Sequence, residues 1–333
     1  MSLRYTWPAE WSEQEAVWMV WPSNDQLWPG KGDEVRQLLA SLMTSIANEL
    51  CVRLICPKNL QAEAKQFLSS GDHLVTLIDI ASDDVWCRDT GPLFVEASNG
   101  DRKILNWSFN AWGMKYKDFR LDGKIALKVS GELGLESISF AEVLEGGAIE
   151  VNGGGLLLTT ESVLLNPNRG SISRNRYEEL FSNFLGVDEV LWLSCGLIGD
   201  DTDGHVDNVA RFVDEMKVLL VMPADLDDPN YLPMQKNLQL LQSYRSSRGE
   251  ALEIDFLPLP QVFCKGKRLP ASYSNFYIAN KSVFVPIYNC SEDFEALEII
   301  QRHFPGHSVT PFDCSLILEE GGAIHCLTQP QFA

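Results

Sequence analysis

The sequence Glu-Gly-Gly-Ala-Ile occurs twice in this chain, at residues 145–149 and again at residues 320–324. A long identical match within one chain suggests a structural unit that is used more than once. In both copies a carboxylate precedes two glycines, which permit close approach of the backbone to neighbouring groups. We therefore expect both copies at the rim of a cleft. Only the second copy continues into His325 and Cys326.

The composition of the 333 residues is that of a folded globular protein, with 45% hydrophobic and 22% charged residues. The net charge of −19 argues against a nucleic-acid partner, because phosphate backbones bind basic patches, and it is compatible with a cationic substrate. No apolar run approaches the roughly 18–20 residues that cross a bilayer, and the N-terminus lacks the apolar segment of a secretion signal. We therefore expect a cytoplasmic protein without a membrane partner, whose eight cysteines are mostly reduced and buried.

Hydrophobic periodicity predicts short strands that alternate with amphipathic helices along the whole chain. Paired strands precede several helices, so we expect an α/β fold of repeated ββαβ-like units in a single domain, residues 1–333. The predicted helices are 33–50, 61–68, 123–133, 174–185, 231–247 and 292–302. The predicted strands are 17–22, 52–56, 73–80, 93–95, 104–107, 156–159, 163–166, 189–193, 217–221, 276–279 and 282–286, with a last strand near the carboxyl end.

Four segments concentrate carboxylate, histidine or cysteine outside the predicted helices: 83–92, 145–147, 200–208 and 321–326. Within the third, His205 and Asp207 are two residues apart and would project to the same side of an extended strand. An imidazole and a carboxylate that face one pocket can serve as a general acid/base and an anchoring charge. The competing interpretation is a turn rich in aspartate with a surface histidine.

A metal centre is a second interpretation of the same segment. Asp200, Asp201, Asp203, His205 and Asp207 supply oxygen and nitrogen ligands at close spacing. The spacing does not fit a calcium-binding EF-hand loop, no HExxH motif is present, and the chain has only five histidines. We therefore expect no metal at this site.

Cys326 and its neighbour His325 form the last cluster. On a strand the two side chains would point to opposite faces, so His325 is poorly placed as the base for Cys326, and His205 is the better candidate. Considered alone, Cys326 would be an ordinary buried thiol.

The residues of the first two clusters are equally ambiguous one by one. Asp89 follows an arginine and precedes a Gly-Pro turn, which is typical of a structural salt bridge. Trp86 is typical of a core residue, and Glu145 could be a turn residue that binds backbone amides.

Together these segments resemble the agmatine deiminase family, also described as the Porphyromonas-type peptidylarginine deiminase family, within the guanidine-modifying or pentein superfamily. The motifs follow one another over nearly the whole chain. They lie at residues 8–11 (Pro-Ala-Glu-Trp), 15–18, 28–30, 86–92 (Trp-Cys-Arg-Asp-Thr-Gly-Pro), 109–113, 145–147, 165–169, 201–208, 268–273 and 322–326 (Gly-Ala-Ile-His-Cys).

The resemblance implies a pentein fold, which is a five-bladed α/β propeller of pseudosymmetric ββαβ units around a central active site. It implies hydrolysis of agmatine to N-carbamoylputrescine and ammonia through a covalent amidino-cysteine, in putrescine synthesis or arginine/agmatine catabolism. It also implies that no cofactor is needed and that the protein forms a homodimer. The implied roles are nucleophile for Cys326, acid/base for His205, guanidinium carboxylates for Asp89 and Asp207, an acid near the histidine for Glu145, and a cover over the substrate's aliphatic chain for Trp86.

Two alternatives remain from the sequence: a peptidylarginine deiminase or other guanidine deiminase, and a non-catalytic guanidine-binding protein. The chain also departs from the pattern of the family. Gln14 stands where a histidine is frequent, and Glu150 and Asn152 stand where a histidine and an aspartate are common. None of these departures removes a residue with an implied catalytic role.

Overall fold

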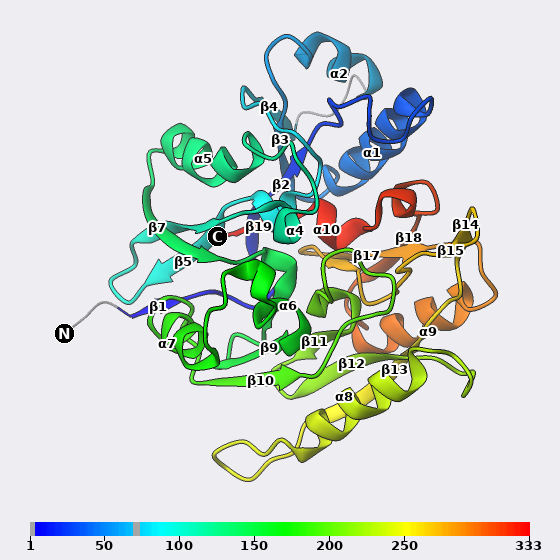
Figure 1. The fold of residues 1–333 in the computed structure, drawn as a ribbon. Helices are drawn as coiled ribbons and strands as arrows, with labels where there is room; N and C mark the ends of the chain where they lie inside the picture. The colour runs from blue at the N-terminus through cyan, green and yellow to red at the C-terminus, as the bar shows by residue number, and fades with distance from the viewer. Residues whose placement is uncertain (1–3, 69–73) are drawn as a thin grey trace.

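A computed structural model describes residues 4–68 and 74–333. In it one pattern of strands and helices recurs (Figure 1). In the first complete example, β5 (Leu93–Ala97) pairs antiparallel with β6 (Arg102–Ser108), and the chain passes through α5 (Ile125–Leu133) before β7 (Glu136–Val143) runs parallel to β6. A helix makes this crossover because a short turn cannot join parallel strands. β1 (Tyr5–Thr6) extends the sheet beside β5.

Three further sheets have the same ββαβ order, with an antiparallel pair followed by a helix and a parallel strand. They are β8 (Ile149–Val151), β9 (Leu156–Thr160), α7 (Arg174–Phe184) and β10 (Glu189–Leu193); β11 (Ala210–Asp214), β12 (Lys217–Met222), α8 (Tyr231–Ser243) and β13 (Glu253–Pro258); and β16 (Tyr277–Ile278), β17 (Ser282–Ile287), α9 (Asp293–His303) and β18 (Ser308–Asp313).

The fifth sheet joins the two ends of the chain, because its strand order is β19-β2-β3-β4. The C-terminal strand pairs antiparallel with β2, and the Trp18 indole N–H donates to Gln331 Oε1 at 2.8 Å across that pair. The same ββαβ order is thus completed by strands from opposite ends of the sequence. The elements are β19 (Gln329–Phe332), β2 (Gln14–Val20), α1 (Gly32–Ile46), β3 (Cys51–Ile55), α2 (Gln61–Phe67) and β4 (Val75–Ile78).

The segment immediately before the first strand of each unit is a short helix or turn. These segments are α3 (Cys87–Thr90) before β5, η2 (Gly146–Ala148) before β8, η4 (Val206–Asn208) before β11, residues 271–276 before β16, and α10 (Ile324–Leu327) before β19. Four of the five fall in or beside the polar clusters of the sequence. The remaining short elements are α4 (Ala111–Met114), η1 (Asp122–Lys124), α6 (Glu161–Leu164), η3 (Pro167–Arg169), β14 (Phe263–Cys264), β15 (Lys267–Arg268) and η5 (Ile317–Glu320).

The long helices lie toward the outside of the molecule in Figure 1, and α4 and α10 lie nearer its middle. The helix α1 shows why this arrangement is stable. Val35, Leu39, Leu42 and Ile46 recur on one face and are fully buried, as the periodicity predicts. Asp33 and Glu34 occupy the first turn, where negative charge favours the positive end of the helix dipole.

One predicted strand is wrong. Residues 163–166 were expected to be extended because they are apolar, but they lie at the end of the helix α6 and the turn that follows. The reason is the residue before the helix. The Thr160 hydroxyl accepts a hydrogen bond from the Val163 amide at 3.3 Å and so caps the start of α6. The predicted strand 73–80 appears as β4, and its first residue lies outside the described residues.

The two Glu-Gly-Gly-Ala-Ile copies are not structurally equivalent. In the first copy the glycines form η2 and Ile149 begins the strand β8. In the second copy Gly321 has φ +100° and Ile324 begins the helix α10. The strand β19 begins only at Gln329, five residues after Ile324, whereas in the first copy the strand begins at the isoleucine itself. The repeat therefore marks two units of the fold, but the exact match of letters does not reflect a shared conformation.

None of the helices in the described ranges combines the length and apolarity needed to cross a bilayer. All eight cysteines lie in those ranges as free thiols, and four of them, Cys56, Cys87, Cys314 and Cys326, are buried while the others are half-buried.

Candidate active site

The segments that precede the first strands meet in one place and bring together residues far apart in the sequence. Asp89 comes from α3, Gly147 from η2, Asp207 from η4, Asn275 from the turn before β16, and Cys326 from α10. Contacts between these groups connect all five segments. Each ββαβ unit therefore contributes one side chain or backbone group to the same centre.

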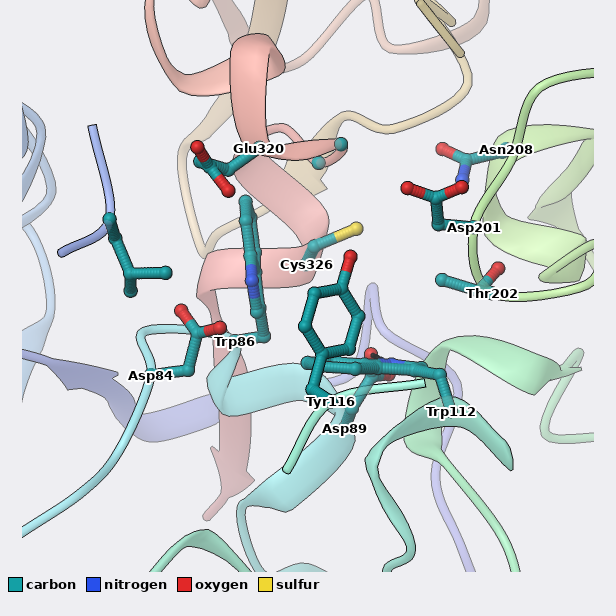
Figure 2. Close-up of a pocket in the computed structure, with 13 residues that line it drawn as sticks. Asp84, Trp86, Asp89, Trp112, Tyr116, Asp201, Thr202, Asn208, Glu320 and Cys326 are labelled. Carbon is teal, nitrogen blue, oxygen red and sulfur yellow. Dashed lines mark hydrogen bonds between the residues drawn. The ribbon is translucent and has the colours of Figure 1, made fainter. Parts of the chain in front are cut away.

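A pocket opens onto this centre. Figure 2 shows the Cys326 sulfur pointing into open space between Trp86 on one side and Asp201 and Asn208 on the other. Three aromatic side chains and four carboxylates are among the residues that line it, and none of these lining residues is a lysine or arginine. The lining residues are Leu27, Asp84, Trp86, Asp89, Trp112, Tyr116, Asp201, Thr202, Asn208, Glu320, Gly321, Gly322 and Cys326.

Cys326 is 6% exposed and is held from two sides. The Asn275 amide donates to Sγ at 3.2 Å, and Asn275 Oδ1 accepts from the Cys326 backbone N–H at 3.3 Å. The thiol donates to Asp207 Oδ2 at 3.7 Å. Burial, followed by the charges of Asp207 and Asp89, raises the pKa of the thiol well above its usual value. The free enzyme therefore holds Cys326 as a thiol at neutral pH.

His205 is fully buried, and among the described residues neither ring nitrogen has a hydrogen-bond partner. Its Nδ1 lies 3.7 Å from Asp89 Oδ1. Burial lowers the pKa of this imidazole, but the carboxylates of Asp89, Asp207 and Glu145 outweigh burial, and the pKa lies above the ordinary value. Unpartnered polar atoms in a buried ring are costly, and they mark the imidazole as a candidate functional group. His205 directly precedes the 3-10 turn η4, so the extended backbone considered for residues 205–207 is not what brings His205 and Asp207 together.

Asp89 and Asp207 lie on either side of Gly147. The backbone N–H of Gly147 donates to Asp89 Oδ1 at 3.0 Å. Asp207 uses only Oδ2, which accepts from His325 Nδ1 at 2.8 Å, and its Oδ1 is buried without a partner. Burial raises the pKa of Asp207, but His325 and His205 lower it further, so the carboxylate is ionised. The site thus contains a buried anionic oxygen free to bind a donor.

A glycine is required at position 147. A Cβ there would lie 2.6 Å from His205 Nδ1, 2.9 Å from Asp207 Oδ2 and 3.0 Å from Asp89 Oδ1. Gly146 is equally constrained, because its Cβ would lie 2.2 Å from the Arg88 carbonyl oxygen. The first glycine pair therefore lies in the floor of the site, where no side chain fits.

Glu145 is fully buried and forms an ion pair rather than binding turn amides. Its Oε1 accepts from Arg169 Nε at 2.9 Å, and Oε2 has no partner. Arg169 is also fully buried; it donates to the Thr202 carbonyl at 2.8 Å and contacts Asp203. The segment that carries His205 is thereby tied to the first Glu-Gly-Gly segment.

Two tryptophans form the aromatic walls. The second glycine pair fits against Trp86, because a Cβ at Gly322 would lie 2.3 Å from the indole ring. The Trp112 indole N–H donates to Asp89 Oδ2 at 2.8 Å. Trp112 has φ +52°, a left-handed conformation that costs a non-glycine residue about 1–3 kcal/mol and is found mainly at functional sites.

The Asp200–Asp207 segment does not have the arrangement of a metal centre. Asp200 accepts hydrogen bonds from the Thr202 backbone N–H and hydroxyl at 2.8 and 2.6 Å, and Asp203 binds Lys115 and Asn168. Within residues 4–68 and 74–333, no group of three or more histidine, cysteine or acidic side chains is placed to hold a metal ion.

Four residues of the centre were missed by sequence reasoning: Asn275, Trp112, Arg169 and Glu10. Trp112, Arg169 and Glu10 lie within motifs that carry the family resemblance, so a signal was present for them. Asn275 lies just beyond the motif at 268–273, and nothing in its neighbourhood in the sequence distinguishes it from a turn residue.

Comparisons with known proteins identify the family. The family described as Porphyromonas-type peptidyl-arginine deiminase matches residues 6–331. The agmatine deiminase of Pseudomonas aeruginosa is 37% identical over 97% of this chain and 94% of its own length. The solved structure of the agmatine deiminase of Enterococcus faecalis superimposes with a TM-score of 0.91 at 30% identity, covering 98% of this chain and 95% of that one. A substrate-bound cysteine-to-serine variant of C. jejuni agmatine deiminase gives 0.90 at 30% identity, covering 99% and 97%. The chain therefore belongs to the Porphyromonas-type peptidyl-arginine deiminase family.

Proposed function

We propose that this protein is an agmatine deiminase, a hydrolase that converts agmatine and water to N-carbamoylputrescine and ammonia. The observation that carries the proposal is the site itself: a buried thiol, an unpartnered imidazole and two carboxylates converge at the end of a pocket lined by acids and tryptophans. The similarity to agmatine deiminases over nearly the whole chain supports the same substrate.

The acidic lining of the pocket favours agmatine over free arginine. Glu320, Asp84 and Asp201 line the pocket along with Asp89. Burial, with a contribution from Glu320, raises the pKa of Asp84 to about 7, so a nearby cation would stabilise its ionised form. Agmatine ends in an ammonium group, whereas arginine would bring an α-carboxylate among these acids. Like charges disfavour the second substrate.

Asp89 and Asp207 would hold the guanidinium. A planar guanidinium binds carboxylates in fixed directions, and the unpartnered Oδ1 of Asp207 offers one such acceptor. Trp86 would cover the aliphatic chain of the substrate, as the lining of the pocket allows. Fixing the guanidinium carbon beside Sγ lowers the entropic barrier to attack.

Binding of the cationic substrate lowers the pKa of the Cys326 thiol, which releases its proton to solvent. In the first step the resulting thiolate attacks the guanidinium carbon and forms a C–S bond. His205, protonated because its pKa is raised, gives its proton to a terminal nitrogen, which leaves as ammonia. The amidino group remains on sulfur. A water molecule then attacks the same carbon and gives one proton to His205. The C–S bond breaks, the carbonyl of N-carbamoylputrescine forms, and the second proton of the water leaves on the sulfur as thiol.

The arrangement of five ββαβ units supports a pentein five-bladed α/β propeller that forms a single domain. Each unit contributes its first loop to one centre, and the strands of the fifth unit come from both ends of the chain. A cytoplasmic location, a homodimer and a role in putrescine metabolism remain predictions.

Ammonia release from agmatine, free arginine and a peptidyl-arginine tests the proposal, with Cys326→Ser as the control. We expect turnover of agmatine, little of arginine, and none by the variant. Preferential turnover of peptidyl-arginine would instead assign the alternative activity within the family. No turnover of any guanidine compound, or full activity of Cys326→Ser, would refute the proposal.

A further inference from the structure

His325 stands directly before the proposed nucleophile, and the mechanism above gives it no part. Its imidazole is 1% exposed and lies between two buried carboxylates. Nδ1 is 2.8 Å from Asp207 Oδ2, and Nε2 is 3.0 Å from Glu10 Oε2 in an ion-pair contact. On the helix α10 the imidazole turns to Asp207 and Glu10, while the Cys326 sulfur turns to Asn275 and the pocket.

The two contacts differ in kind. Burial raises the pKa of Asp207, but the hydrogen bond from His325 lowers it below its usual value, so the carboxylate is ionised and accepts from Nδ1. Among the described residues Nε2 completes no hydrogen bond, and its contact with Glu10 is one of proximity to a carboxylate. The Nδ1 bond is therefore the one by which His325 holds Asp207.

Glu10 fixes the position of the ring from behind. Its oxygens bind Arg88 at 2.7 Å and Arg211 at 2.9 Å, and Oε1 also accepts from the Ile278 backbone N–H at 2.9 Å. Arg211 is in turn held by Glu150 at 3.0 Å, the residue that replaces a common histidine of the family. His325 therefore joins a rigid buried ion network to a single oxygen of Asp207.

We propose that His325 is a positioning residue, which holds Asp207 by Oδ2 so that its other oxygen faces the substrate guanidinium. Because Oδ2 also lies 3.7 Å from the Cys326 sulfur, the same bond fixes the carboxylate beside the thiol. The role of Asp207 as a substrate ligand rests on the proposed function. The hold on Asp207 does not.

Two substitutions separate the hydrogen bond to Asp207 from the contact with Glu10. His325→Asn keeps an N–H donor near the position of Nδ1 but removes the nitrogen that faces Glu10, and His325→Ala removes both. His303 provides a matched control, because its Nε2 lies 3.0 Å from Asp255 Oδ2 on the remote helix α9. Agmatine binding is measured by calorimetry in the Cys326→Ser background, and kcat and KM are measured with Cys326 present.

We expect His325→Ala to weaken agmatine binding and raise KM by about tenfold to a hundredfold, as expected for loss of a charge-assisted hydrogen bond. We expect His325→Asn to restore most of the binding but not all of kcat, and His303→Asn to leave both unchanged. Unchanged binding and kcat/KM in a folded His325→Ala variant would overturn the proposal.

Calorimetry in the Cys326→Ser background needs no turnover, so it separates this proposal from the proposed function. If the protein with Cys326 released no ammonia from agmatine but His325→Ala still weakened agmatine binding, the proposed function would fail and the role of His325 would stand.

Discussion

A methyl group added at position 147 should greatly reduce catalysis while the protein still folds. Gly147→Ala places a Cβ where His205 Nδ1 would be 2.6 Å away, Asp207 Oδ2 2.9 Å and Asp89 Oδ1 3.0 Å. Real Cβ atoms do not approach polar atoms this closely, so at least the imidazole and one carboxylate must move. These are the groups that the proposed reaction uses.

The size of the effect follows from the displacement. Restoring ordinary contact distances requires shifts of roughly 0.5–1 Å in side chains that are fully buried, and a misplacement of about 1 Å at a catalytic group costs on the order of a hundredfold in rate. Inserting a methyl group into a packed core destabilises a protein by about 1–3 kcal/mol. We therefore expect kcat/KM to fall by about a hundredfold or more in a protein that still folds.

The measurement is ammonia release from agmatine, paired with urea denaturation of the same samples. Gly131→Ala is the matched control, because Gly131 lies inside the helix α5 and a Cβ there meets no atom within 4 Å. That control should keep full activity and gain about 0.5–1 kcal/mol of stability. A Gly147→Ala variant with activity within a factor of about three of wild type would refute the packing argument.

Three further results are expected. The raised pKa of His205 stabilises the folded protein below the ordinary histidine pKa of about 6.5, and this contribution is lost as pH rises through the raised value. The stability difference between wild type and His205→Gln in urea should therefore shrink with rising pH; a difference that grows would contradict the assignment. Trp112→Phe keeps the aromatic wall but removes the 2.8 Å hydrogen bond to Asp89, so KM for agmatine should rise about tenfold, and an unchanged KM would show that this bond does not position the carboxylate. Arg169→Met leaves the fully buried Glu145 without its partner and should cost about 3–5 kcal/mol in urea unfolding; a loss below about 1 kcal/mol would contradict the assignment of a stabilising buried ion pair.

The sequence predicted which residues would meet but not how they are presented. Cys326, His205, Asp89 and Asp207 do converge, and the motifs of the family made that expectation possible. The sequence arguments considered extended backbone at both segments, but residues 206–208 form a 3-10 turn and residues 324–327 form the helix α10. Both differences have one cause: short turns before strands carry no periodicity of their own, so apolar and polar residues there cannot distinguish a turn from a strand.

The role of Asn275 could not be predicted from the sequence at all. Its side chain binds Cys326 through both the thiol and the backbone, at 3.2 and 3.3 Å, yet 51 residues separate the two in the chain. A neutral amide in a serine-rich turn has no feature that indicates chemistry until the fold brings a thiol beside it. The order of the units supplies the missing information, because residues 271–276 occupy the place in their unit that α3, η4 and α10 occupy in theirs.

The electrostatics of the centre resolve an apparent contradiction in the proposed reaction. Cys326 must become an anion, yet its nearest charged neighbours are carboxylates, and their charges raise the pKa of the thiol. A guanidinium bound between Asp89 and Asp207 places positive charge beside the sulfur and neutralises both acids at once. The nucleophile is therefore formed only when a cationic substrate occupies the site, which makes the charge of the substrate a condition for reaction as well as for binding.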